Sequence, residues 1–195
     1  MKKGLISADA RVTVLLAEYR AMYDLALFRL NALDRRVPLT GSTLAASLGA
    51  ALLLPIQAQA LILSALPLTL VWFLRTTINH ARSFEDALRR IEQIEDKLNS
   101  LAGDELVRFQ SQHPSRGKAT GGRTGRESIT AVLAASLMIL VGCGALTMSL
   151  KLNDTTRPAL LCECGFVALY LASVVYRLRR YRYGRLVSPT AVQGQ

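Results

Sequence analysis

The sequence predicts an all-α membrane protein with four transmembrane helices arranged as two hairpins, plus amphipathic helices on the cytoplasmic side. Two observations lead to this fold class. Hydrophobic residues make up 51% of the 195 residues although the formal net charge is +10, and these hydrophobic residues gather in long windows that lack charge. A soluble chain of this size would have to hide that apolar surface in one small core, so we expect a bilayer around it.

Three windows of the sequence contain almost no charge. Residues 37–74 and 128–150 have no charged side chain, and residues 159–176 have only Glu163. A helix rises about 1.5 Å per residue and the hydrocarbon core of a bilayer is about 30 Å thick, so about 20 residues cross it once. The second and third windows are therefore one span each.

The first window is nearly twice as long as one span. Pro55 lies near its middle, and proline removes a helical hydrogen bond and clashes with the preceding turn. We expect a tight turn there, with residues 39–54 running out and 56–74 running back. A re-entrant pair that does not cross the membrane is the alternative.

The sidedness of the spans follows from lysine and arginine. These residues concentrate in the N-terminal segment, the middle segment and the tail, whereas the other two connections contain only Lys151 and Arg157. By the positive-inside rule both termini and the middle segment are cytoplasmic. The expected segments are an amphipathic helix (1–36), a first transmembrane hairpin (37–74), a cytoplasmic helix with a basic glycine-rich loop (75–127), a second transmembrane hairpin (128–176) and a basic tail (177–195).

Two cytoplasmic segments repeat apolar residues in steps of three and four, which is typical of amphipathic helices. The first ends or bends before Pro38, because the residue before a proline disfavours helix. The second also carries Glu85 and Arg89, expected as an ion pair on an exposed face. The two stripes pack on one another as an antiparallel stalk, or also form a seam with a partner or between subunits. Residues of the second stripe are Leu88, Ile91, Ile94, Leu98 and Leu101.

Small residues recur every fourth position in the first span, at Gly41, Ala45 and Gly49. Small residues at this spacing permit close approach of helices inside a bilayer, where lipid gives no hydrophobic drive for association. The pattern therefore predicts tight helix packing and supports assembly, although it does not give a number of subunits.

A basic stretch without any carboxylate precedes the third span. Its glycines and Lys118 do not fit the G-x-x-x-x-G-K-[ST] phosphate loop, because Lys118 directly follows Gly117 and no strand is expected before it. Anionic lipid headgroups are the leading partner for these cations, nucleotide or nucleic acid is the second, and a protein is the third. The candidate phosphate- or lipid-binding residues are Arg116, Lys118, Arg123 and Arg126 in the loop and Arg177, Arg179, Arg180 and Arg182 in the tail.

Residues that could carry catalysis or hold a metal are scarce. His80 and His113 have no metal-ligand spacing, and no G-x-S-x-G nucleophile motif is present. We therefore expect no enzymatic activity, no metal and no cofactor.

Glu163 is the one ionisable residue inside a predicted span. Such a carboxylate suggests function, and a ring of carboxylates selects cations in some channels, so Glu163 is a pore candidate. The alternatives are an interfacial side chain that meets Lys151 or Arg157, and a proton-coupled site.

The three cysteines, Cys143, Cys162 and Cys164, also lie in the predicted spans. A disulfide between Cys143 and Cys164 is geometrically conceivable because their depths are comparable. Buried, unreactive thiols are the favoured interpretation.

The layout of the whole chain resembles a known class of proteins. An N-terminal helix ending "ALDRR", a short-turn hairpin, the charged helix "RRIEQIEDKLNSLAGDEL" and a second hairpin followed by arginines are similar to the small four-span membrane proteins of bacterial anti-phage operons. The membrane subunits of the Kiwa and Hailong systems are examples. This resemblance covers architecture, and it implies a multi-pass protein of the bacterial inner membrane with a cytosolic operon partner.

These observations lead to a functional hypothesis. The chain would be a homo-oligomeric membrane effector or channel in anti-phage defence, gated by a cytoplasmic signal. The alternatives are a non-conducting scaffold that recruits a cytosolic partner protein, and a housekeeping membrane protein without a role in defence.

Overall fold

The computed structural model describes residues 7–109 and 120–181. All regular secondary structure in these ranges is helical, so the all-α prediction is confirmed for them. The helices are α1 (Ala8–Ala51), α2 (Ile56–Ala102), α3 (Gly122–Ser149) and α4 (Thr156–Arg180).

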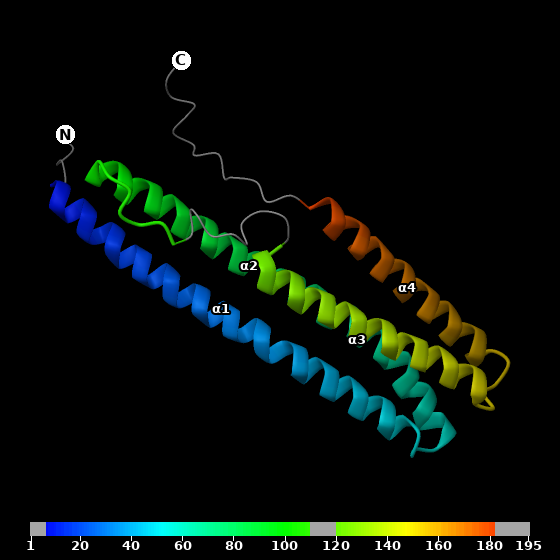
Figure 1. The fold of residues 1–195 in the computed structure, drawn as a ribbon. Coiled ribbons are helices and arrows are strands. Elements are labelled where there is room, and N and C mark those ends of the chain that lie inside the picture. The colour runs from blue at the N-terminus through cyan, green and yellow to red at the C-terminus, as the bar shows by residue number, and fades with distance from the viewer. Residues whose placement is uncertain (1–6, 110–119, 182–195) are drawn as a thin grey trace, which may run out of the picture.

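Helices α1 and α2 are antiparallel and lie side by side along their whole length, joined by a short turn (Figure 1). At about 1.5 Å per residue, their 44 and 47 residues correspond to about 66 and 70 Å. Helices α3 and α4 are shorter and accompany only the half of this pair that contains the turn (Figure 1). The other half, residues 8–36 and 84–102, projects beyond them, and we call it the stalk.

Three of the described helices are long and apolar enough to cross a membrane. They are Ala58–Ala102, Gly122–Ser149 and Thr156–Arg180. Helix α1, with 44 residues, is long enough but does not reach the same hydropathy, because much of it belongs to the amphipathic stalk. The helical content and the apolar segments are those of a multi-pass membrane protein.

Helix α1 does not end at Pro38, so of the two expectations for this proline, an end or a bend of the helix, the end is wrong. The helix continues through Pro38 to Ala51. Leu33 and Leu44 are buried on either side of the proline, whereas Pro38 itself is exposed. Packing on α2 therefore continues past the proline, and this tertiary contact outweighs the loss of one backbone hydrogen bond.

The inner face of α2 holds the helices together. Its buried residues recur every seventh position, as in a coiled-coil seam, at Leu63, Leu70, Thr77, Phe84, Ile91 and Leu98. Most of them join side chains of α1, α3 and α4 in one hydrophobic core. The core thus runs from the apolar spans into the stalk without a gap.

Two glycines allow the start of α3 to approach α2 closely. Gly121 has a positive φ of 71°, and a Cβ there would lie 2.9 Å from the carbonyl oxygen of Ala81. A Cβ on Gly125 would lie 2.3 Å from the carbonyl oxygen of Thr120 and 3.3 Å from the Cβ of Ala81. Part of the glycine-rich stretch is therefore required for packing against α2.

The close approach gives a prediction about stability. Gly125→Ala should lower the free energy of unfolding by about 1–3 kcal/mol, the usual cost of inserting a methyl group into a filled space. The measurement is the thermal unfolding midpoint of the purified protein in detergent.

Gly144→Ala is the matched control for this prediction. Gly144 lies on the same helix with nothing within 4 Å of an added Cβ, and alanine is the better helix former by up to about 1 kcal/mol. Its midpoint should stay the same or rise. Equal effects at both positions would contradict the close approach at Gly125.

Candidate functional site

A buried carboxylate links three helices where they meet the stalk. Glu85 of α2 is 2% exposed, and its Oε2 accepts a hydrogen bond from the backbone N–H of Gly121, with N and Oε2 3.1 Å apart. Its Oε1 accepts from the hydroxyl of Tyr181 and from the guanidinium of Arg89. Arg89 also donates to the hydroxyl oxygen of Tyr181 at 3.0 Å. We call Glu85, Arg89, Gly121 and Tyr181 the Glu85 junction.

The location of the Glu85 junction follows from its sequence neighbours. Gly121 immediately precedes α3, and Tyr181 immediately follows α4. Glu85 therefore ties one end of each of these two helices, the end that the sequence predicts to be cytoplasmic, to one point on α2. A buried charge costs several kcal/mol unless it is paired and hydrogen-bonded, and the three donors provide that compensation.

The predicted exposed ion pair of Glu85 and Arg89 is only half correct. The pair exists, but Glu85 is buried and Arg89 is partly buried, because the start of α3 packs on α2 at Ala81, one turn away from Glu85. Glu92 and Glu95, seven and ten residues after Glu85, are buried as well. The spacing of these three glutamates places them on one side of α2, which could have indicated a covered polar face. Spacing alone does not show which neighbouring helix would cover that face.

The junction changes the acidity of Tyr181. Burial, followed by the hydrogen bond to Glu85 and the Glu85 charge, raises the pKa of the Tyr181 phenol to about 12, while Arg89 and Arg82 act in the opposite direction. The phenol therefore stays protonated at neutral pH and remains a donor to Glu85.

Further polar contacts join α1 to α2 within the stalk. Arg90 donates to one oxygen of Glu18 through Nε at 2.7 Å and through Nη2 at 2.5 Å. The hydroxyl of Tyr19 donates to Oε1 of Glu95 at 3.3 Å. Burial and the Glu95 carboxylate raise the pKa of Tyr19, which keeps this phenol a donor.

His80 and Arg36 form a contact between α1 and α2 just outside the second predicted span. Arg36 Nη2 lies 2.7 Å from His80 Nε2, so the arginine donates and the neutral imidazole accepts. Burial, then the charges of Arg36 and Arg29, lowers the pKa of His80. Neutral His80 thus carries its proton on Nδ1, and its Nε2 joins α2 to Arg36 of α1.

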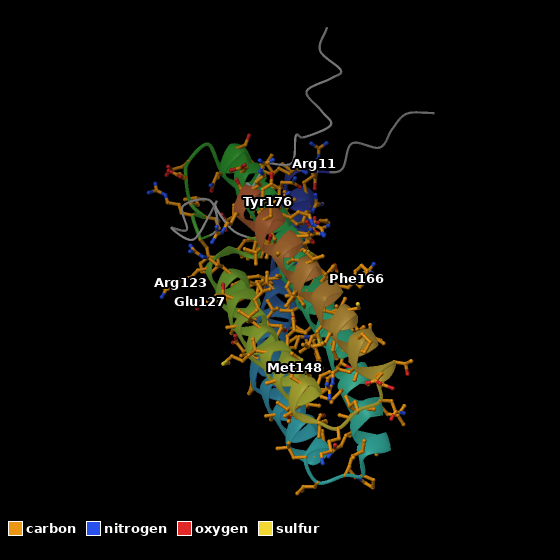
Figure 2. All side chains as sticks on the ribbon, turned by 90° about the vertical axis from the view of Figure 1, so that its right-hand side faces the viewer. Arg11, Arg123, Glu127, Met148, Phe166 and Tyr176 are labelled. Carbon is orange, nitrogen blue, oxygen red and sulfur yellow. The ribbon has the colours of Figure 1, made fainter. Side chains whose placement is uncertain are left out.

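The structure separates the predicted phosphate- or lipid-binding cations into groups. Arg116, Lys118 and Arg182 lie outside the described residues. Arg123 is exposed and pairs with Glu127 at 2.9 Å, and Figure 2 shows both side chains on the side of α3 away from α4. Arg126 and Arg179 line one cavity between α3 and α4.

The remaining cations near the end of α4 contact their own helix. Arg177 donates to the hydroxyl of Ser173 at 3.1 Å. The guanidinium of Arg180 lies 4.4 Å from the ring centroid of Tyr176. The structure therefore brings together only Arg126 and Arg179, among the described candidates, around a common space.

The predicted seam residues pack within the chain. Ile91, Ile94 and Leu98 are buried, and Leu88 is partly buried against the same core. Only Leu101 is exposed, at 50%. The intrachain antiparallel stalk therefore uses this stripe, and a contact with another molecule would need other residues.

Glu163 and the cysteines lie in the far half of α3 and α4. Glu163 is partly buried, and no ion pair joins it to a cation within residues 7–109 and 120–181. Arg157 donates to the backbone oxygen of Leu150 at 2.9 Å. Cys143, Cys162 and Cys164 are free thiols, of which Cys143 is buried and Cys162 is exposed.

The part of the chain that the structure describes contains no cluster of three His, Cys, Asp or Glu side chains that could hold a metal ion. Comparison with known proteins gives no assignment either: no family model, no curated protein and no solved structure matches the chain.

The Glu85 junction predicts a loss of stability when its charge is removed. Glu85→Gln keeps the side-chain shape but weakens the charge-assisted bonds from Arg89 and Tyr181. The free energy of unfolding should fall by about 1–3 kcal/mol, the usual cost of impairing hydrogen bonds at a buried charged group. The thermal midpoint in detergent measures the change.

Glu127→Gln is the control for this variant, because Glu127 also pairs with an arginine four residues away but on the surface. Exposed pairs contribute little, so its midpoint should not move. If Glu85→Gln also left the midpoint in place, the junction would not stabilise the fold.

Tyr181 predicts how stability responds to alkaline pH. Its folded pKa of about 12 is above the ordinary value of about 10. A raised pKa gives a contribution that is complete below about pH 10 and is lost as the pH rises toward 12. Tyr181→Phe should therefore reduce the decline in thermal midpoint across this interval, measured against the wild type in the same detergent.

The exposed Tyr176 provides a control, because Tyr176→Phe leaves Glu85 and its donors in place. This variant should decline with pH as steeply as the wild type. A slope unchanged in Tyr181→Phe would argue against the protonated contact with Glu85.

Proposed function

We propose that the protein is a homo-oligomeric effector of the bacterial inner membrane, a channel whose state is set by a signal at its cytoplasmic stalk. The supporting observation is one apolar face of α1 that residues 7–109 and 120–181 leave largely exposed. Its residues are spaced by three, four or seven positions and so share one side of the helix. We call Val14, Ala21, Leu25, Phe28, Ala32, Leu39, Ala46 and Ala50 the outer face of α1.

The outer face is strongly exposed within a single chain. Val14, Phe28 and Leu39 are 63%, 67% and 61% exposed. Val14 and Phe28 belong to the stalk, which projects beyond α3 and α4 (Figure 1). Lipid covers exposed apolar residues inside a bilayer but cannot do so in the cytoplasm. The stalk part of this face therefore calls for a protein surface.

A second copy of the chain is the partner that fits best. The outer face contains one charged neighbour, the exposed Arg35 between Ala32 and Leu39. It continues from the stalk into the apolar part of α1, which we propose as a fourth membrane-spanning helix beside those of α2, α3 and α4. An isologous contact places the same face of each subunit against the other. Gly41 and Gly49 have open space around them in the single chain, so the row of small residues is also available for close approach in the membrane.

The long helices provide a route from signal to membrane. Helix α2 runs without a break from the apolar half into the stalk, and α1 does the same past Pro38. The Glu85 junction fastens the cytoplasmic ends of α3 and α4 to α2. A displacement of the stalk would therefore move all of the helices that we propose as spans, which is what gating from the cytoplasm requires.

In this proposal α1 and α2 form the first transmembrane hairpin and α3 and α4 the second, with both termini cytoplasmic. Glu163 would be repeated around the axis of the assembly and act on permeating ions. The proposed role is anti-phage defence, in which opening collapses ion gradients. A nucleotide, a nucleic acid or a cytosolic operon partner would provide the trigger.

The second candidate function is a non-conducting scaffold for a cytosolic partner. A cavity of about 580 Å³ at the free end of the stalk favours it. Both helices contribute to this cavity, including Val14 and Leu101 with Arg11, Asp96 and Lys97. A mixed apolar and charged rim of this kind suits a protein segment.

The test combines assembly and conductance. Light scattering gives the molar mass of the purified protein in detergent. Insertion into planar bilayers gives its ion current, with and without a panel of nucleotides and short oligonucleotides. Phe28→Asp should reduce the mass to that of a monomer and abolish the current, because a buried unpaired charge would prevent the contact between outer faces.

Leu27→Asp is the matched control, since Leu27 is 43% exposed and adjacent to Phe28 but faces about 100° away around the helix. It should keep both mass and current. Glu163→Gln should keep the mass and change ion selectivity. A wild-type oligomer that stays silent across the panel would reject the channel in favour of the scaffold, and a monomeric wild type would reject the assembly.

A further inference from the structure

A groove of about 800 Å³ lies between α3 and α4. Its walls are mostly apolar, with Leu133 and Leu137 from α3 and Ala168 and Ala172 from α4. Arg126 and Arg179 line the same groove at the cytoplasmic ends of these helices. The space is therefore amphipathic along its length, with both cations at one end.

The charged end of the groove has no ion-pair partner within the part of the chain that the structure describes. No ion pair joins Arg126 or Arg179 to a carboxylate within the described residues, whereas the neighbouring Arg123 is paired with Glu127. Thr120 also lines the groove and is only 2% exposed, and its hydroxyl oxygen has no hydrogen-bond partner in the described chain. A buried hydroxyl without a partner is uncommon in a folded protein, so this end is suited to a ligand with acceptor oxygens.

The length of the groove matches one leaflet of a bilayer. The lining residues extend eleven positions along each helix, from Arg126 to Leu137 and from Arg179 back to Ala168. Eleven residues correspond to about 16 Å, which is about half of the 30 Å hydrocarbon core. Arg126 and Arg179 lie just outside the predicted spans 128–150 and 159–176, at the depth of the inner headgroups.

We propose that this groove is a binding site for one anionic glycerophospholipid of the cytoplasmic leaflet. The phosphate lies between Arg126 and Arg179 and accepts a hydrogen bond from the hydroxyl of Thr120. Arginine suits this role because its guanidinium contacts phosphate through a planar fork of donors. One acyl chain lies along Leu133, Leu137, Ala168 and Ala172.

The apolar wall decides between ligand classes. A nucleotide or inorganic phosphate would occupy only the charged end and would leave the apolar wall of the groove uncovered. A phospholipid matches both parts at once. Among the described residues, none of those that line the groove is acidic, so none would repel the headgroup.

The experiment measures lipid retention on the full chain by native mass spectrometry from a neutral detergent. The probes are phosphatidylglycerol and phosphatidylcholine with identical acyl chains. The wild type should retain phosphatidylglycerol preferentially. The double variant Arg126→Gln with Arg179→Gln should lower its affinity about 30-fold, which corresponds to about 1 kcal/mol for each arginine near an anionic headgroup.

Two comparisons separate this groove from general surface charge. The double variant Arg123→Gln with Arg177→Gln removes the same charge outside the lining and should retain the lipid. Ala168→Trp keeps all arginines but fills the apolar wall, so it should also release the lipid, whereas Leu169→Trp on the adjacent exposed position should not.

Equal loss in both arginine pairs would overturn the proposal, because binding would then follow net charge alone. Equal retention of both lipids would overturn it as well. Retention by Ala168→Trp together with displacement of the lipid by inorganic phosphate would show a headgroup site without the groove. Each of these results is independent of whether the protein conducts ions.

Discussion

The structure depends on the need to satisfy one buried carboxylate. Glu85 lies away from water, so its charge must be balanced by donors that come to it. Those donors belong to three places far apart in the sequence: a neighbouring turn of α2, the first residue before α3 and the first residue after α4. Because these donors all bind Glu85, the start of α3 and the end of α4 lie beside the same turn of α2.

Much of the fold could be predicted from the distribution of charge. The uncharged windows locate the apolar parts of α2, α3 and α4, and the period of apolar residues correctly indicates helical stalk segments. Pro38 was misjudged because local propensity says nothing about packing on both sides of it. The burial of Glu85 was missed because an ion pair four residues apart looks the same on an exposed and on a covered face.

The candidate site shows the same limit. The sequence identifies the cations of the basic loop and of the tail as one group of candidates, but helix geometry decides which of them line the same cavity. Arg123 and Arg126 are three residues apart, yet one pairs with a surface carboxylate and the other lines the groove with Arg179. Such sorting depends on how α3 is rotated against α4, and Gly121 and Gly125 are the positions where α3 closely approaches α2.

The position of Tyr181 has a consequence for biosynthesis. Because a ribosome makes the chain from its N-terminus, α1 and α2 can pair long before α4 has been translated. Glu85 acquires its last donor only when residue 181 has emerged and α4 has come to lie beside its neighbours. The end of the bundle that we propose as cytoplasmic is thus completed last. A chain in which α4 has not yet packed leaves Glu85 poorly compensated, and this uncompensated acid distinguishes it from a chain with all four helices in place.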